Sequence, residues 1–461
     1  MHTSIINRLI VSGFVVFIAG VFGTLIVYLN NGTFSDVAFA LVIVILLNIA
    51  FLLVSFFYVL RSSIDESFNL FNPFFFPLVF FAILYVLPSL IHVYFWRNTC
   101  SDFGNYLHLI ALSSFLLGVV LNRQFALSNL IKLNKYFYRL GKLDKNTVYF
   151  IYFLGFTLLM TYGIQTGVTT TLLSGGNIEG LRRYVEIGRG IQKETGILFI
   201  SFSMVWIVAE EVNHSKHKKI TLHSIVLIVV TSLIIFITTG HKAPVLTPLL
   251  LIVGMRAKDR YISPMKVGLF GLMLLILIGG LTYIRGTRAG DLTSSILNKG
   301  IYYQSLLYES NYLPIVKIIQ EGRMDLQHGK EYIQNAAFII PRFLWPDKPL
   351  NFDLYLKEQL HRSFEGGGLP ATPIGSLYLN FGLIGVVFGM LGIGVCYAIL
   401  FDIYLSAPNI ESSMLALYGL WILLNPSLIL PRVELIILLM GVLFLADKIL
   451  RRESYTIIPR T

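Results

Sequence analysis

Long apolar stretches recur along the whole 461-residue chain, and they constrain its fold more than any other feature. A helix needs roughly 20 apolar residues to cross the hydrocarbon core of a bilayer. About twelve stretches approach that length, near residues 9–29, 37–60, 73–94, 105–121, 147–167, 195–211, 220–238, 243–255, 266–284, 374–402, 413–430 and 435–450. We therefore expect an all-α polytopic membrane protein with about twelve transmembrane helices.

The composition agrees with a membrane protein and limits other classes. Charged residues make up only 13% of the chain, whereas soluble domains carry about 25%. The net charge of +11 would suggest nucleic-acid binding in a soluble chain, but here its position relative to the bilayer matters first. Two cysteines, Cys100 and Cys396, form neither a disulfide framework nor a metal site. The first apolar stretch is too long for a cleaved signal peptide, so we interpret it as the first span.

Four short basic segments predict the orientation of the chain. They lie at residues 122–147, 214–219, 256–266 and after residue 446. Short basic loops favour the cytoplasm, and with twelve spans all four fall on the same side. Both termini are then cytoplasmic. The predicted organisation is nine N-terminal spans in residues 1–285, one long extracytoplasmic loop with short helices in 286–373, and three C-terminal spans in 374–461.

A second group of basic residues falls on the outer side. Guanidinium groups stay charged and bind phosphate through two hydrogen bonds, so these residues are candidates for binding an anionic, lipid-linked substrate. They could equally reach toward lipid headgroups, and Lys242 could simply end the short turn TTGHKAP (238–244). The candidates are Arg182, Lys242, Arg285, Arg288, Arg342 and Arg432.

Three residues could accept a proton from an attacking hydroxyl group: Glu309, His361 and Glu434. A carboxylate or an imidazole within hydrogen-bond reach is suited to this role. Glu434 stands two residues after Arg432 at the mouth of the last span, so it is costly unless paired or functional. His361 could also be an ordinary loop histidine. The chain lacks HExxH, CxxC and DxD motifs, and EGGGLPATPIGS (365–376) is not a phosphate-binding loop, so we expect no metal or other cofactor.

Several motifs in residues 230–440 together resemble a known family. The motif IIPRFLWPDKP (339–349) lies in the long loop, PATPIGS (370–376) opens a span, and TTGHKAP and PRVE (431–434) lie at span ends. In sequence and order they resemble the Wzy-type polymerases of bacterial surface polysaccharides, the O-antigen and enterobacterial common antigen polymerase family. That family usually has Gly-Thr/Ser-Arg where this chain has His241 and Lys242, which keeps a positive charge but loses the guanidinium fork.

The resemblance implies a function on the outer face of the bacterial plasma (inner) membrane. It implies a GT-C-like polymerase/ligase architecture and a metal-independent glycosyltransferase for O-antigen-like polysaccharide. The donor would be a growing glycan on undecaprenyl diphosphate, and the acceptor the non-reducing end of a lipid-linked repeat unit. The basic residues would bind the diphosphate, and Glu309, His361 or Glu434 would take the proton. A chain-length regulator is a further expected partner, and nucleic acid is not.

Two alternatives share much of this pattern. An O-antigen ligase has the same architecture and differs in its acceptor. A lipid-linked oligosaccharide flippase or another transporter also has about twelve spans, but it should carry ionisable groups in the middle of its spans. Most charges in this chain stand at the ends of the predicted spans instead.

Overall fold

The computed structural model describes residues 102–125, 143–174, 190–214, 220–240, 243–259, 315–336 and 371–424, with single positions at 72–73, 76–77, 312, 340, 344–345, 347, 356 and 441. Every element among these residues is an α-helix, and none of them forms a strand. The helices are α5 (Asp102–Phe125), α8 (Lys145–Gln165), α9 (Val168–Leu173), α11 (Gly190–His214), α12 (Leu222–Thr239), α13 (Ala243–Asp259), α16 (Lys330–Ala336), α18 (Thr372–Ser406) and α19 (Ile410–Leu424).

Four of these helices, α8, α11, α12 and α18, are long and apolar enough to cross a membrane. Shorter apolar stretches lie in α5 (Ile110–Arg123) and in α19. The all-helical, multi-pass prediction is thus confirmed for the described part of the chain. Seven predicted spans coincide with α5, α8, α11, α12, α13, α18 and α19. The spans predicted near 9–29, 37–60, 73–94, 266–284 and 435–450 lie outside the described residues, so a total of about twelve stays a prediction.

One predicted span ends differently in the structure. The apolar pattern suggested a helix to residue 167, but α8 ends at Gln165 and the short helix α9 begins at Val168. Gly167 between them has φ 70, a left-handed conformation that glycine adopts readily and that commonly ends helices. The amide N–H of Thr166 caps the end of α8 by donating to the Tyr162 carbonyl. The predicted end of this span therefore lies within two residues of the end of α8.

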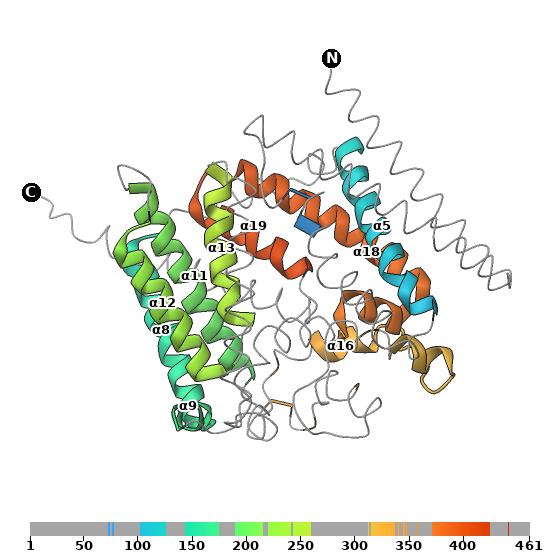
Figure 1. The fold of residues 1–461 in the computed structure, drawn as a ribbon, viewed down its shortest axis with the longest axis horizontal. Helices are drawn as coiled ribbons and strands as arrows, with labels where there is room; N and C mark the ends of the chain where they lie inside the picture. The colour runs from blue at the N-terminus through green and yellow to red at the C-terminus, as the bar shows by residue number, and fades with distance from the viewer. Residues whose placement is uncertain are drawn as a thin grey trace, which may run out of the picture.

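The helices α8, α11, α12 and α13 stand side by side as one group (Figure 1). Aromatic residues of α8, such as Phe150 and Phe153, and branched residues of α12, such as Ile225 and Val229, are exposed on the protein surface. In water such apolar faces would be unfavourable. In a bilayer they contact lipid chains, which agrees with the span assignment of these two helices.

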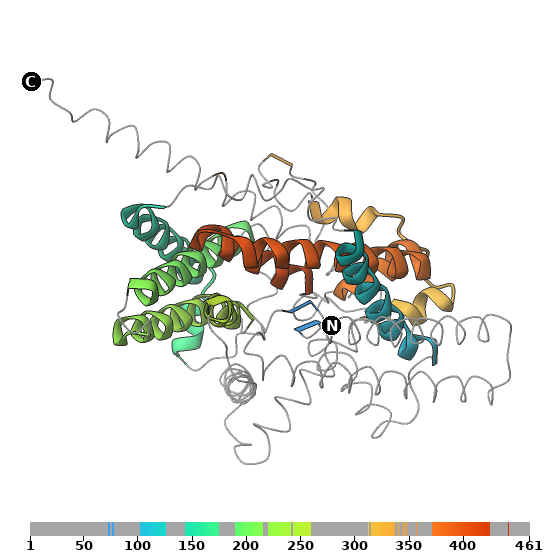
Figure 2. The same ribbon diagram turned by 90° about the horizontal axis from the view of Figure 1, so that it is seen from above.

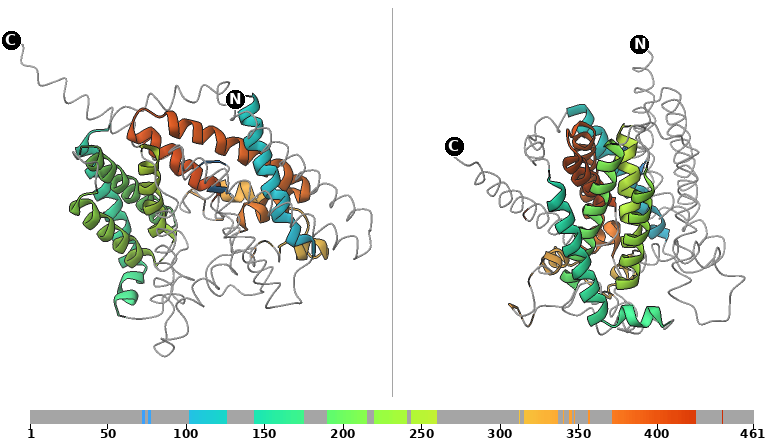
Figure 3. Two further views of the ribbon diagram at one scale, coloured as in Figure 1. Left: turned by 45° about the horizontal axis from the view of Figure 1, so that its top comes forward. Right: turned by 90° about the vertical axis from the view of Figure 1, so that its left-hand side faces the viewer.

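A second unit is the crossing of α5 and α18, seen from two further sides in Figure 3. At their contact a Cβ atom on Gly394 would collide with the carbonyl oxygen of Phe115. A Cβ atom on Gly118 would likewise collide with the carbonyl oxygen of Leu391. Small residues at such a crossing let two membrane helices approach backbone to backbone, which favours their association by close packing.

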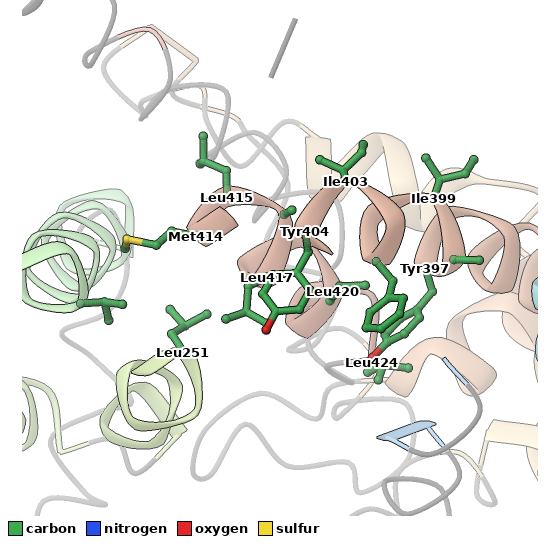
Figure 4. Close-up of a cluster of buried hydrophobic side chains, with 14 of the residues drawn as sticks. Leu251, Tyr397, Ile399, Ile403, Tyr404, Met414, Leu415, Leu417, Leu420 and Leu424 are labelled. Carbon is green, nitrogen blue, oxygen red and sulfur yellow. The ribbon is translucent and has the colours of Figure 1, made fainter. Parts of the chain in front are cut away.

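The helices α18 and α19 connect the two units and form much of the core. Seen from above, they lie between the four-helix group and α5 (Figure 2). Tyr404, Leu417 and Leu420 point toward one another between α18 and α19, and Leu251 of α13 approaches them (Figure 4). The Tyr404 hydroxyl donates to the Gly254 carbonyl at 2.5 Å, so this buried phenol has its partner on α13.

Buried polar contacts tie several helix ends together at one end of the protein. The Leu143 amide and the Trp206 indole donate to the same oxygen of the buried Glu411 carboxylate, at 2.9 and 3.0 Å. The Lys258 ammonium group donates to the Ser413 hydroxyl at 2.7 Å. The starts of α8 and α19 therefore lie beside the C-terminal half of α11 and the end of α13. The basic segments 122–147, 214–219 and 256–266 adjoin these helices in sequence. That this end of the protein faces the cytoplasm stays a prediction from those basic segments.

Candidate functional site

The nine residues singled out from the sequence all lie outside the described part of the chain, so the structure neither groups nor separates them. Their roles stay predictions. They are Arg182, Lys242, Arg285, Arg288, Glu309, Arg342, His361, Arg432 and Glu434. The described residues of the predicted long loop and of the start of α18, where two of the family motifs lie, define the candidate site (Figure 1).

The corner motif IIPRFLWPDKP is described at four positions. Ile340, Leu344, Trp345 and Asp347 are all exposed, and the Trp345 side chain is 39% exposed. This tryptophan is therefore not part of the buried core. An aromatic ring at the protein surface suits an anchor at the membrane interface, where tryptophan is enriched.

The motif PATPIGS opens α18, as expected from its prolines. Thr372 is the first residue of this helix, and its hydroxyl accepts a hydrogen bond from the Gly375 amide at 3.2 Å. Pro373 follows at a position where a helix needs no amide donor. Thr372 has φ 55. A β-branched residue rarely adopts this left-handed conformation, and such strain persists only where the surroundings hold it.

Ten residues later α18 is broken. Gly382 has φ 64 and ψ −152 within the helix, a backbone conformation that is open almost only to glycine. The turn before α16 satisfies carbonyl groups just ahead of the break. The Gln327 amide donates to the Leu379 carbonyl at 2.9 Å, and the His328 amide donates to the Asn380 carbonyl at 3.0 Å. Residues 327–329 thus cap the N-terminal segment of α18, which we define as residues 372–381.

Glu331 is the polar centre of this contact. Its Oε2 accepts hydrogen bonds from the Ser376 hydroxyl and from the Asn380 amide group, each at 2.6 Å. The Asn380 side-chain oxygen in turn accepts from the Gly329 amide at 2.9 Å. Glu331 is only 3% exposed. We call Glu331, Ser376 and Asn380 the Glu331 cluster.

Burial raises the pKa of the Glu331 carboxyl above its ordinary value, while the hydrogen bonds from Ser376 and Asn380 act in the opposite direction. Desolvation is the larger cause because it penalises the charged form of a buried acid. Burial also raises the pKa of the neighbouring Tyr332 phenol. Among the described residues no cation forms an ion pair with Glu331. Lys317 and Arg323, the cations of the preceding segment that form ion pairs, both pair with Glu321.

A second contact holds the same helix segment from another side. Tyr312 is fully buried, and its Cβ would lie 3.0 Å from a Cβ added at Gly375. The Tyr312 hydroxyl lies 3.4 Å from Nδ1 of His108 in α5. The described part of the segment 312–336 therefore packs against the N-terminal segment of α18, with α16 beside it (Figure 1).

This arrangement suits positioning better than direct chemistry. The Glu331 carboxyl is covered by protein, so a large glycolipid could not reach it without a rearrangement. Within the described ranges no three His, Cys, Asp or Glu side chains gather closely enough to hold a metal ion. The Glu331 cluster can fix the place of PATPIGS, and the predicted proton acceptors and cations lie outside the described residues.

Sequence reasoning passed over Glu331, although a weak signal exists. Glu331 and Asn335 stand four residues apart, so they share one face of α16, and both are buried. Ile333, on another face, is 72% exposed. The helix thus buries its polar face and exposes an isoleucine. An amphipathic pattern alone would predict the reverse, because it carries no information on a polar partner such as Asn380.

Comparison with known proteins gives two relatives of one kind. The chain is 25% identical over 210 residues to the O-antigen polymerase of Salmonella typhimurium and to that of Salmonella typhi. Each alignment covers 44% of this chain and 49% of the relative, so the chain spans about half the length of the curated relatives it matches. No family model matches the chain. No solved structure matches it either.

These relatives confirm the resemblance to the Wzy-type polymerases that the sequence motifs indicated. The similarity is to proteins named as polymerases of a surface polysaccharide, and the described helices are those of a multi-pass membrane protein.

Proposed function

We propose that this chain is a polymerase of an O-antigen-like bacterial surface polysaccharide. The observation that carries the proposal is the similarity to two O-antigen polymerases over 210 residues. The four motifs in residues 230–440 and the apolar helices support it. The enzyme is a glycosyltransferase that works at the outer face of the inner membrane, with both termini in the cytoplasm and about twelve spans.

The proposed reaction joins two lipid-linked glycans. A hydroxyl at the non-reducing end of one repeat unit attacks the first sugar carbon of a growing glycan held on undecaprenyl diphosphate. A glycosidic bond forms, the bond from that carbon to the diphosphate oxygen breaks, and the lipid diphosphate leaves with the electron pair. A chain-length regulator is a proposed partner of this step.

The residues proposed for the chemistry divide into two groups. Cations neutralise the charge that develops on the leaving diphosphate, which is how a fixed positive site lowers such a barrier. A carboxylate or imidazole removes the proton of the attacking hydroxyl, and no metal is required. The cations are Arg182, Lys242, Arg285, Arg288, Arg342 and Arg432, and the proton acceptor is one of Glu309, His361 and Glu434.

Deletion of the gene tests the function against its two alternatives. In a strain that makes the polysaccharide on lipopolysaccharide, loss of a polymerase leaves the core with one repeat unit on a silver-stained gel. Loss of a ligase or of a flippase leaves the bare core. The proposal requires the single repeat unit to persist, and restoration of the polymer ladder when the gene is returned.

Substitution of three arginines tests the proposed cations. Arg288 and Arg432 stand near glycine or proline, and Arg342 lies in the corner motif. Arg288→Ala, Arg342→Ala and Arg432→Ala should each abolish the ladder while the protein level in the membrane is unchanged. The exposed Arg323, which pairs with Glu321 at 2.6 Å, offers a control change that should leave the ladder intact. If all three test variants make normal polymer, the diphosphate is bound elsewhere.

A further inference from the structure

The N-terminal segment of α18 is a separate piece of helix held from outside by the chain that precedes it. It begins at the strained Thr372 and ends at the break at Gly382. Its carbonyl groups near the break are capped by the turn 327–329. Its side chains Ser376 and Asn380 both donate to one oxygen of Glu331.

We propose that Glu331 and Asn380 are positioning residues for the transfer reaction, and that Glu331 works as an uncharged carboxyl group. They hold the N-terminal segment of α18, and with it PATPIGS, in the place that the reaction needs. This inference rests on the proposed polymerase function, and it adds to it a pair of residues and a protonation state.

The surroundings of Glu331 favour the uncharged form. The carboxyl is 3% exposed, and its two partners, a hydroxyl and an amide, are neutral donors. A buried carboxylate without a paired cation is costly, and no described cation faces it. The dipole of the short helix α16 acts in the opposite direction, because Glu331 stands in its first turn. Of the titratable neighbours in the chain, Lys330 and His328 are exposed, and Tyr332 is a partly buried phenol whose pKa burial raises.

The same geometry argues that these residues act through the helix and do not contact the substrate. Asn380 is fully buried and uses its oxygen for the Gly329 amide and its nitrogen for Glu331 and the Ser376 carbonyl. The strain at Thr372 is kept only while its surroundings hold the segment. Without Glu331 the segment can shift, and a shift of about 1 Å near a reacting group can cost about 100-fold in rate.

The test compares two changes at Glu331 with one change at a matched position. Glu331→Gln keeps an oxygen that can accept from Ser376 and Asn380 but can carry no negative charge. Glu331→Ala removes the acceptor. Glu321→Gln, in the same segment but exposed and paired with Arg323, is the control. Each variant is returned to the deletion strain, and polymer on the gel is divided by the amount of full-length protein in the membrane.

We expect Glu331→Gln and Glu321→Gln to make polymer within about twofold of the wild type, and Glu331→Ala to fall at least tenfold per molecule. Equal loss in Glu331→Gln and Glu331→Ala would overturn the inference, because the charge would then be needed. Full activity per molecule in Glu331→Ala would also overturn it. If Glu331→Ala does not accumulate, Ser376→Ala takes its place, because it removes one of the two donors to Glu331. We expect Ser376→Ala to lower the polymer per molecule by less than tenfold. An unchanged amount of polymer per molecule would overturn the inference.

The wild-type arm separates this inference from the proposed function. If the returned wild-type gene restores no ladder to the deletion strain, the polymerase proposal fails. If it does, the results at Glu331 concern the positioning role alone.

Discussion

The amide group of Asn380 donates a hydrogen bond of 2.6 Å to the buried carboxyl of Glu331, across 49 residues of sequence. This bond joins α16 to α18 just ahead of the break at Gly382. Asn380→Asp would remove the amide that donates to Glu331 and to the Ser376 carbonyl, and it would bury a second acid in its place. A buried ionisable group without its donors is costly, so we expect polymer to fall at least tenfold, measured on the gel per molecule of protein.

A second change should reverse this loss. In the double variant Asn380→Asp with Glu331→Gln, the new amide can donate to the new carboxylate, so the bond is restored with its direction reversed. We expect the double variant to recover most of the polymer that Asn380→Asp loses. Additive losses in the two variants would mean that the two residues do not act as a pair, because contacting residues are expected to be coupled.

The stability of the contact between α16 and the N-terminal segment of α18 should depend on pH. Burial raises the pKa of Glu331 above its ordinary value near 4.5, so the folded contact binds the proton more tightly than the separated chain does. The contribution to stability is then complete below the ordinary value and is lost as pH rises through the raised pKa. The amides of Gln327 and His328 cap the N-terminal segment of α18. As pH rises through the raised pKa of Glu331, their hydrogen exchange should become faster by more than the intrinsic chemical rate of exchange increases.

The variant Glu331→Gln serves as the control for this measurement. It cannot ionise, so protection of these two amides should become independent of pH after correction for the chemical exchange rate. The same pH dependence in the wild type and in Glu331→Gln would show that another group is responsible.

The sequence predicted the class of fold and the places of several helices, because apolar length alone reports the need to cross a bilayer. It predicted that PATPIGS opens a helix, since threonine and proline at a helix start act locally. It placed the end of one span at Gly167, within two residues of the end of α8. It missed the break at Gly382, where the apolar pattern continues through the glycine and only the backbone conformation reveals the break.

The candidate site was harder to predict for a different reason. Glu331 is identified by its partners, and these lie 45 and 49 residues away. A single sequence does not show that a polar side chain in α16 will find a hydroxyl and an amide on a distant helix. The candidates from the sequence, which are five arginines, one lysine, one histidine and two glutamates, follow from side-chain chemistry, whereas Glu331 stands out through its burial.

The break in α18 gives a prediction on stability. Gly382→Ala has space for its Cβ, since the nearest atom, Cδ1 of Leu326, would lie 3.7 Å away. The backbone conformation, however, is strained for any residue with a Cβ, and such strain costs about 1–3 kcal/mol. We expect a lower midpoint of thermal unfolding for the purified protein in detergent, and less polymer in cells.

Gly392→Ala is the matched control in the same helix. A Cβ at Gly392 meets nothing within 4 Å and its backbone is helical. We expect no loss of stability there, because alanine favours a helix over glycine. If Gly392→Ala is as harmful as Gly382→Ala, the break is not the cause of the effect.

The close crossing of α5 and α18 makes a further prediction. Gly394→Ala would push a Cβ into the backbone of Phe115, which cannot move aside as a flexible side chain could. The two helices must separate, and the buried contact between them is lost. We expect the membrane level of Gly394→Ala to fall strongly, as measured by immunoblot, while Gly392→Ala two residues earlier accumulates normally. Equal levels of the two variants would contradict the crossing.

Reconstitution tests the central claim most directly. The purified chain is placed in liposomes with undecaprenyl diphosphate-linked repeat units of the host's polysaccharide, and the products are separated by size. The account predicts a ladder of lipid-linked glycans that grows by whole repeat units, with release of undecaprenyl diphosphate. Repeat units that stay single in the presence of folded protein, with no diphosphate released, would contradict it.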